Sequence, residues 1–222
     1  MKNILYTIAI CICITNVSAQ QLPLYSQYTQ IPLLYNPAYA GIDTMINASL
    51  VHRSQWKGIP GAPVTSAVVI DGPVRVKNLG IGGLIYNDVT DITSQIGAYS
   101  IYSYKVKLKE EHHLFFGLSL GVLSNRIDLT KAVVNDANDP FITSNSFQRT
   151  TTFDGNFGVN YIWKGLHAGL SVPHLFGNKM QYVNTQASSY YRLSRHYMLS
   201  LKYTFDINKE KGMKIYPLVM LR

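Results

Sequence analysis

Large apolar side chains alternate with small or polar ones along several stretches of the chain, and this two-residue period restricts the fold more than any other feature. The clearest example is residues 153–164. One face there carries Phe, Val, Tyr and Trp, and the other mainly Asp, Asn and Gly, with Gly155 and Ile162 as exceptions. Successive side chains of a β-strand point to opposite faces, so this alternation indicates strands whose two faces meet different surroundings. Residues 113–122 and 193–206 repeat the pattern.

Weaker strand signals fill much of the remaining sequence, and no stretch carries a convincing long helical period. Together with the three clear segments they predict an all-β chain of about nine strands. Several are near the ~10 residues that a tilted strand needs to cross a bilayer. The six weaker segments are residues 46–53, 65–70, 79–86, 92–106, 166–172 and 213–221.

The connections between these segments differ in length. Residues 128–150 and 176–189 are long and polar and predict loops, whereas four shorter polar runs predict turns. Short turns on one rim and long loops on the other are typical of an outer-membrane barrel. The predicted turns are residues 71–73, 86–88, 109–111 and 208–212.

Composition favours a membrane barrel over a soluble β-sandwich, which is the main structural alternative. Charged residues make up 14% of the chain, against about 25% in ordinary globular proteins. The 16 tyrosines suit aromatic positions at the membrane boundaries. The polar strand faces are mainly Gly, Ser, Asn and Thr, which suits a barrel interior better than the outside of a sandwich. The expected fold is an antiparallel transmembrane β-barrel of outer-membrane type, complete or partial, with an extended N-terminal segment.

The first 19 residues have the pattern of an export signal. Lys2 supplies the positive charge, residues 4–14 form a short apolar run, and small residues lead to a cleavage point after Ala19. The run is too short to cross a bilayer as a helix, which needs about 20 apolar residues. Both cysteines, Cys11 and Cys13, lie within it. The mature chain is therefore expected to have no disulfide, thiol nucleophile or Cys-ligated metal.

The charge of the chain gives little support to nucleic-acid binding. Lys and Arg number 20 and Asp and Glu 12, and Lys2 alone falls in the signal, so the mature charge is 19 − 12 = +7. The basic residues are scattered rather than clustered, and an exported chain leaves the cytoplasm. Nucleic acid is therefore not a predicted partner. Attraction to anionic lipid head groups or to an acidic partner fits the charge better.

Histidines do not form a convincing metal or catalytic site in the sequence. His112 and His113 are neighbours, so on a strand they point to opposite faces and cannot easily bind one ion. His167, His174 and His196 are separated and have no obvious carboxylate partner nearby in sequence. We predict no catalytic residue, no metal site and no cofactor, and we do not expect an enzyme.

Three motif matches have plainer explanations. The run from Gly117 to Gly121 has the letters of a nucleophile elbow but lies within a predicted strand, where its glycines suit packing in a barrel interior. Ser194 and His196 fall on one strand face, yet no acid that would orient the histidine is identifiable. Residues 87–91 offer a weak cation site but lack the closing glutamate of a calcium loop.

Two motif blocks near the start of the chain are more specific. The first comprises Ser26-Gln27-Tyr28 and Tyr35-Asn36-Pro37-Ala38-Tyr39-Ala40-Gly41, and the second comprises Arg53-Ser54-Gln55-Trp56 and Gly61-Ala62-Pro63-Val64-Thr65. Asn36-Pro37 favours an extended or turning backbone, and Gly41 permits a tight bend. These blocks resemble the N-terminal motifs of the PorP/SprF family, outer-membrane proteins of the type IX secretion system of Bacteroidota. Further glycine-rich motifs follow in the family's order, so the resemblance covers residues 21–222.

The resemblance implies a non-enzymatic role in type IX secretion and, in some bacteria, in gliding motility. Family members assist the export or cell-surface attachment of cargo proteins with a C-terminal sorting domain. The implied partners are outer-membrane lipid, such cargo and other components of the secretion system. Contact with cargo or machinery is expected through the long loops and through these motif residues: Gln27, Tyr28, Asn36, Pro37, Ala38, Gly41, Arg53, Gln55, Trp56, Gly61 and Pro63.

The chain divides by these arguments into three parts. Residues 1–19 are the signal, residues 20–45 a plug or periplasmic motif segment, and residues 46–222 the barrel strands. Because family members usually continue further, we expect a truncated member with a partial barrel. Two other functions stay open at this point: a porin-like diffusion channel and a secreted β-sandwich adhesion module.

Overall fold

The computed structural model describes residues 29–131, 147–183, 188–208 and 212–222. These residues form strands and three short 3-10 helices, and no helix among them is long and apolar enough to cross a bilayer. The helices are η1 (Pro32–Leu34), η2 (Pro37–Tyr39) and η3 (Leu129–Lys131). The strands are β1 (Asn47–Ser54), β2 (Val64–Pro73), β3 (Leu79–Thr90), β4 (Thr93–Lys109), β5 (His112–Asp128), β6 (Phe147–Trp163), β7 (Leu166–Val172), β8 (Lys179–Val183), β9 (Ser188–Arg192), β10 (Met198–Tyr203), β11 (Phe205–Asn208), β12 (Met213–Ile215) and β13 (Leu218–Leu221).

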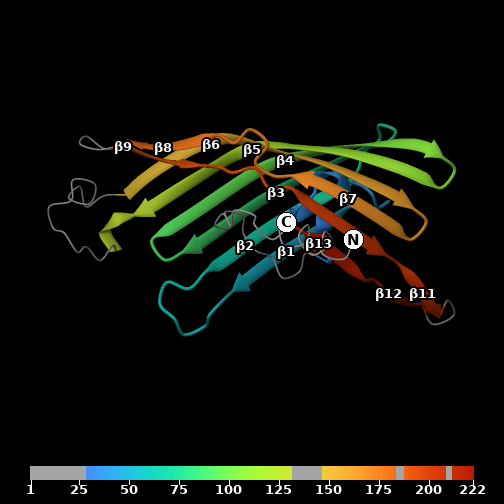
Figure 1. Cartoon of the computed structure of the whole chain (residues 1–222), viewed down its shortest axis with the longest axis horizontal. Coiled ribbons are helices and arrows are strands. Elements are labelled where there is room, and N and C mark those ends of the chain that lie inside the picture. The colour runs from blue at the N-terminus through green and yellow to red at the C-terminus, as the bar shows by residue number, and fades with distance from the viewer. Residues whose placement is uncertain (1–28, 132–146, 184–187, 209–211) are drawn as a thin grey trace, which may run out of the picture.

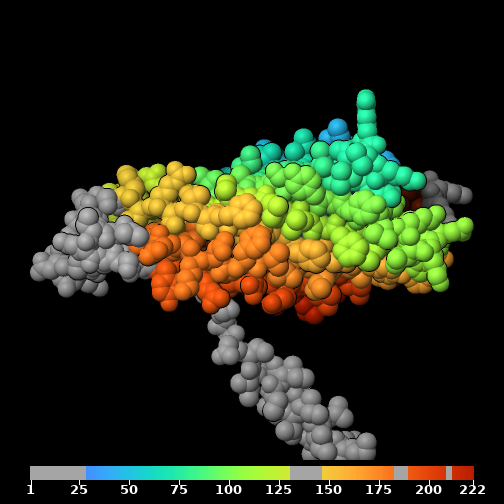
Figure 2. All heavy atoms as spheres, turned by 90° about the horizontal axis from the view of Figure 1, so that it is seen from above, coloured from blue at the N-terminus to red at the C-terminus, as the bar shows by residue number. Residues whose placement is uncertain are grey.

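Nine of these strands form one antiparallel sheet in the order β1-β2-β3-β4-β5-β6-β7-β10-β13. The sheet is curled into a half-barrel with strongly tilted strands (Figure 1). Seen from above, the colours of β3 to β7 follow one another from the upper to the lower side of a continuous elongated body (Figure 2). Among the described residues, β1 and β13 stand at the two ends of the sheet and do not pair with each other. The predicted all-β antiparallel fold of barrel type is confirmed.

The two rims of the half-barrel differ. On the turn rim, β2–β3, β4–β5 and β6–β7 are joined by residues 74–78, 110–111 and 164–165. The fourth connection on that rim, β10–β13, is longer and contains the β11–β12 hairpin. On the loop rim at the opposite end, β1–β2, β5–β6 and β7–β10 are joined by longer stretches, and only β3–β4 has a tight turn there (Figure 1). Two small hairpins accompany the sheet: β8–β9 between β7 and β10, and β11–β12 between β10 and β13.

The predicted alternation is observed along the central strands. In β6, Phe153 and Trp163 are 52% and 41% exposed on the outer face, whereas Asp154 and Asn160 are fully buried on the inner face. The neighbouring strand β5 has the same phase, because its Leu118 is directly opposite Phe157 in the register. The outer face of the central strands is thus largely apolar and exposed. No second sheet covers it, and Phe176 stacks on it at Phe153, with ring centroids 5.7 Å apart.

The inner face is filled rather than open. Buried inward residues of β2 to β5, such as Val69, Leu84 and Ile101, pack against Leu33 from the N-terminal segment. Met180, Leu193 and Met198, from β8, the β9–β10 connection and β10, complete this cluster. The hydrophobic core therefore lies between the concave sheet and chain segments that cross it.

Two predicted turns are wrong. Residues 86–88 lie inside β3, which continues to Thr90, and the chain reverses at Asp91 and Ile92. Asp88 is held there because it accepts a hydrogen bond from the Thr65 hydroxyl of β2, so tertiary pairing overrides its turn preference. Residues 71–73 end β2, and the turn follows them.

Two predicted segments of the C-terminal half also need correction. The predicted loop 176–189 contains β8, and the predicted strand 193–206 is interrupted, because residues 193–197 are irregular and β10 begins only at Met198. The Arg195 side chain is used there as a tether, since its Nε donates to the Leu175 carbonyl at 2.7 Å. Predicted residues 213–221 form two short strands, β12 and β13.

Candidate functional site: the N-terminal segment on the inner face

The described part of the N-terminal segment, residues 29–45, crosses the concave face of the sheet and is anchored by Asn36. The Asn36 Oδ1 accepts from the Ala38 amide at 2.9 Å and so caps η2. Its Nδ2 reaches across to the sheet and donates to the carbonyls of Val159 at 3.1 Å and Leu170 at 3.4 Å. One buried side chain thus fixes both the local turn and its position over β6 and β7.

Gly41 ends this turn and ties the segment to the opposite half of the sheet. Its amide donates to the Asp71 carboxylate of β2 at 2.8 Å. Its φ of +63° lies in the left-handed region, where glycine carries no steric cost. Next to it, the Ala40 carbonyl accepts a hydrogen bond from the Ser103 hydroxyl of β4. The segment therefore contacts β2, β4, β6 and β7.

Glycines form the floor beneath this segment. A Cβ added to Gly117 would lie 2.1 Å from the Ala38 amide nitrogen, and one added to Gly158 would lie 2.0 Å from the Asn36 Oδ1. At Gly80 the added Cβ would lie 2.2 Å from the carbonyl oxygen of Ala40. Strands β3, β5 and β6 thus lack side chains where the N-terminal backbone approaches most closely. The expectation that the strand glycines serve interior packing is met at these positions.

Aromatic contacts hold the same segment at its sides. Tyr39 stacks on His167 of β7 with ring centroids 6.2 Å apart, and burial raises the pKa of its hydroxyl to about 12. The guanidinium of Arg222 lies 4.9 Å from the centre of the Tyr35 ring. The N-terminal segment therefore also contacts the last residue of the sequence.

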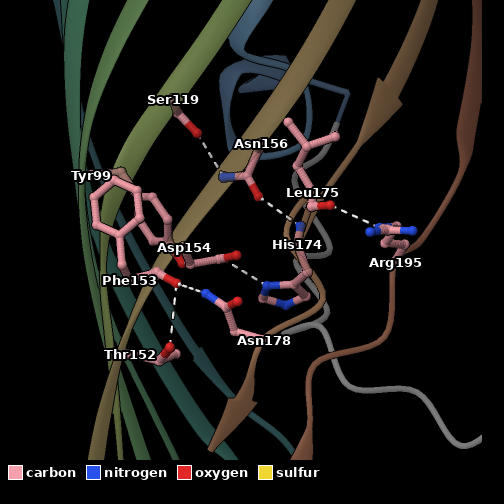
Figure 3. Close-up of polar contacts among 10 residues, drawn as sticks. All are labelled: Tyr99, Ser119, Thr152, Phe153, Asp154, Asn156, His174, Leu175, Asn178 and Arg195. Atoms are coloured by element: carbon pink, nitrogen blue, oxygen red, sulfur yellow. Dashed lines mark hydrogen bonds and ion pairs between the residues drawn. The ribbon is translucent and has the colours of Figure 1, made fainter.

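A buried polar cluster lies beside the segment on β6 and the chain that follows β7 (Figure 3). The Asp154 carboxylate accepts from the Tyr99 hydroxyl at 2.9 Å and lies 2.7 Å from His174 Nδ1. The Asn156 amide donates to the Ser119 hydroxyl at 2.7 Å and accepts from the His174 backbone amide at 3.1 Å. His174 itself has a left-handed φ of +54°, so its contacts stabilise a conformation that is uncommon for residues other than glycine.

No carboxylate partner of His174 is obvious nearby in the sequence, and the structure brings one from a distance. Asp154 lies 20 positions earlier, and the β6–β7 hairpin brings the two side chains together because the chain runs back along the edge of β6 after β7 ends. The sequence did contain a signal for this contact. Asp154 is a charged residue on the polar face of the strong strand pattern of residues 153–164, and a buried charge requires a partner.

The chemistry of this cluster is that of a structural anchor. A cavity of about 50 Å³ separates it from the N-terminal segment and is lined mainly by apolar and aromatic residues. Ser119 Oγ is held by Asn156 rather than by His174, so no hydroxyl is paired with the imidazole as a nucleophile would be. Within the described ranges, no three His, Cys, Asp or Glu side chains gather as metal ligands.

The second motif block lies at the loop rim, apart from the first. The backbone amide of Gln55 donates to the Pro63 carbonyl at 3.0 Å and closes the β1–β2 connection. The Gly61 carbonyl accepts from the Asp91 amide at 2.9 Å, which joins this connection to the β3–β4 turn. Trp56, near the start of this connection, is 67% exposed.

The predicted contact residues thus fall into three sets. Asn36, Pro37, Ala38 and Gly41 are gathered on the inner face, while the residues of the second block surround the β1–β2 connection at the loop rim. Gln27 and Tyr28 lie outside the described residues, as does the predicted signal. Ser194 and His196, once considered as a pair on one strand face, lie in an irregular connection.

Comparison with known proteins gives one family. The model for the type IX secretion system membrane protein PorP/SprF matches residues 17–222, nearly the whole chain. No curated protein and no solved structure matches it. The family is a structural one of the secretion system and is not known as enzymatic. The resemblance suggested by the two motif blocks is therefore confirmed, and the chain belongs to the PorP/SprF family of type IX secretion system membrane proteins.

Proposed function

We propose that this membrane component of the type IX secretion system is an outer-membrane protein that assists secretion or surface attachment of cargo with a C-terminal sorting domain. In gliding bacteria it serves motility through the same cargo. The observation that carries the proposal is the pairing of the family match with a half-barrel whose inner face is occupied by the N-terminal segment. Such a filled scaffold suits protein contacts at its rim, without catalysis.

The filled inner face also argues against the diffusion channel. The N-terminal segment lies directly on β5 and β6, where an added Cβ at Gly117 or Gly158 would strike its backbone or Asn36. A porin needs a water-filled lumen. The sandwich module is disfavoured by the outer face, because apolar residues such as Ile85, at 60% exposure, contact no second sheet.

The loop rim is the surface that we assign to cargo or machinery contact. Trp56 and Ile59 are 67% and 59% exposed in the β1–β2 connection, which a hydrogen bond from the Asp91 amide to the Gly61 carbonyl joins to the β3–β4 turn. Exposed aromatic and aliphatic side chains on a fixed backbone are suited to become buried anchors in a protein interface. Three of the four connections on this rim are long and three of the four on the other are short turns, which favours the loop rim as the outward-facing one.

The experiment is gene deletion followed by complementation. Cells lacking the gene should retain or degrade the cargo, and the wild-type gene should restore cargo to the medium or cell surface. The variant Trp56→Ala/Ile59→Ala should restore the protein to the outer membrane but not the cargo. The matched control Val76→Ala, which removes an exposed apolar residue at the turn rim, should restore both. Unchanged cargo in the deletion strain would reject the secretion role.

A further inference from the structure

Two arginines lie directly opposite each other on the outer face near the loop rim. The register pairs Arg126 of β5 with Arg149 of β6, and both side chains are exposed. Like charges at directly opposed positions of an antiparallel pair repel each other. Among the described residues, no carboxylate forms an ion pair with either guanidinium.

The few contacts that the two arginines make hold them in place without neutralising them. Arg149 Nε donates to the Ser124 hydroxyl at 2.8 Å. The guanidinium of Arg126 lies 3.8 Å from the centre of the Phe147 ring. Each guanidinium has five N–H donors, so most of them remain for a ligand.

Both arginines line a cleft of about 370 Å³ on the outer face. Its other lining residues include two hydroxyls, Ser94 and Ser124, and two apolar side chains, Ile96 and Phe147. The site therefore combines two fixed positive charges with hydroxyl donors and apolar walls. An oxyanion is the ligand that satisfies such donors, because guanidinium groups bind phosphate oxygens in pairs.

A second hollow lies further down the same face, toward the middle of the sheet. It has a volume of about 580 Å³, a floor that includes Gly83, Ala98 and Gly121, and walls that include Ile85 and Phe153. Ser94 of the arginine cleft and Ala98 of this groove are four residues apart on β4, or roughly 13 Å. An extended acyl chain of a lipid whose phosphate lies at the arginines can reach across this distance, and the groove lies on the apolar side of the arginines.

We propose that the outer face carries a binding site for a phosphate-bearing membrane lipid, with its phosphate between Arg126 and Arg149 and an acyl chain in the Ala98 groove. The inference rests on the outer face meeting the bilayer, and it goes beyond the secretion role, which the cargo assay tests separately. Arginines that merely extend toward the water boundary need no shared ligand. The opposed geometry, the hydroxyls and the groove together favour one.

The test is native mass spectrometry of the full-length protein in detergent, titrated with phosphatidic acid. Diacylglycerol with the same chains and inorganic phosphate are titrated separately. Phosphatidic acid should bind at least about tenfold more tightly than either, because both halves of the site contribute. Equal binding of diacylglycerol would overturn the phosphate site. Equally tight inorganic phosphate would mean a free-anion site and overturn the lipid.

Variants separate the two halves. Arg126→Gln/Arg149→Gln should weaken phosphatidic acid binding about tenfold, and the lysine pair at the same positions should recover part of it because charge returns without the planar fork. Ser100→Leu, which narrows the groove from an exposed position, should weaken phosphatidic acid but not inorganic phosphate. The matched control Arg75→Gln/Lys77→Gln removes two exposed charges at the turn rim. If it weakens binding as much as the arginine pair, the site is not specific and the proposal fails.

Discussion

The two faces of the same strands carry different residues: large exposed apolar side chains on the outer face, and glycines and buried residues on the inner face. In β6, Phe157 is 36% exposed on the outer face, while its neighbour Gly158 is buried beneath Asn36 on the inner face. The outer face is covered by no second sheet and is contacted locally by Phe176. The inner face packs closely against the N-terminal segment, with glycines where the two backbones meet. The alternation of side chains along a strand therefore only assigns each residue to one face or the other. What packs against that face decides which residue types fit there.

The largest expected effect comes from adding a side chain where the inner face and the N-terminal segment approach each other most closely. Gly117→Val would place a Cβ 2.1 Å from the Ala38 amide nitrogen, a backbone atom that cannot move alone. We expect a loss of more than about 3 kcal/mol of folding free energy, because overpacking displaces the whole segment. Urea unfolding in detergent measures it.

The control for this change lies on the outer face. Gly83→Val adds the same atoms where the nearest neighbours of the Cβ lie 3.7 and 3.9 Å away. It should leave the unfolding midpoint nearly unchanged. Equal destabilisation by the two substitutions would contradict the distinction between a filled inner face and an open outer face.

The next largest effect removes the buried carboxylate of the inner face. Asp154→Ala leaves the Tyr99 hydroxyl and His174 without their shared acceptor. We expect a loss of about 3 kcal/mol, because buried donors then remain unpaired. Unfolding followed by tyrosine fluorescence measures it. Asp206→Asn, at an exposed ion pair with Lys214, is the control and should change stability by no more than about 0.5 kcal/mol.

A smaller effect tests what the outer face meets. Leu118→Lys places a charge at the middle of β5 on the exposed apolar face. In a bilayer it should cost about 2 kcal/mol, because the ammonium leaves water. The free energy of reversible unfolding, measured for the variant and the wild type in lipid vesicles and in detergent micelles, gives this cost. A cost near zero in vesicles would argue that this face does not meet hydrocarbon.

The smallest effect isolates one anchor of the N-terminal segment. Asn36→Asp keeps the oxygen that caps η2 but loses the Nδ2 donor to the Val159 and Leu170 carbonyls. We expect a loss of about 1 kcal/mol from those hydrogen bonds, before any charge repulsion from the carbonyls. Limited proteolysis near residue 30 should speed up relative to wild type. Unaltered cleavage would mean that the glycine floor alone holds the segment.

Sequence reasoning recovered the main sheet well because its strands have two different faces. The segments predicted around β1 to β7 coincide with observed strands, and β7 has the predicted bounds. The errors fall where the strand pattern is absent or misleading. The hairpin β8–β9 was predicted as a loop because it is short and polar, and Asp88 was assigned to a turn although its partner Thr65 lies in another strand.

The candidate site was recovered only in part, for a physical reason. The residues Asn36 to Gly41 were singled out by their motif, yet no local pattern says that they lie on Gly117 and Gly158. The anchor of Asp154 and His174 was missed, because hydrogen bonds between distant residues leave no periodic trace in a single sequence.

The sequence by itself determined the class of the fold, the faces of its strong strands and, through its motifs, the family. These follow from short-range geometry, since a strand side chain points up or down according to its position alone. Only the tertiary structure decided what covers the inner face, which carboxylate meets His174, and that Arg126 faces Arg149. Those contacts depend on register and curvature over many strands, and neither quantity can be read from neighbours along the chain.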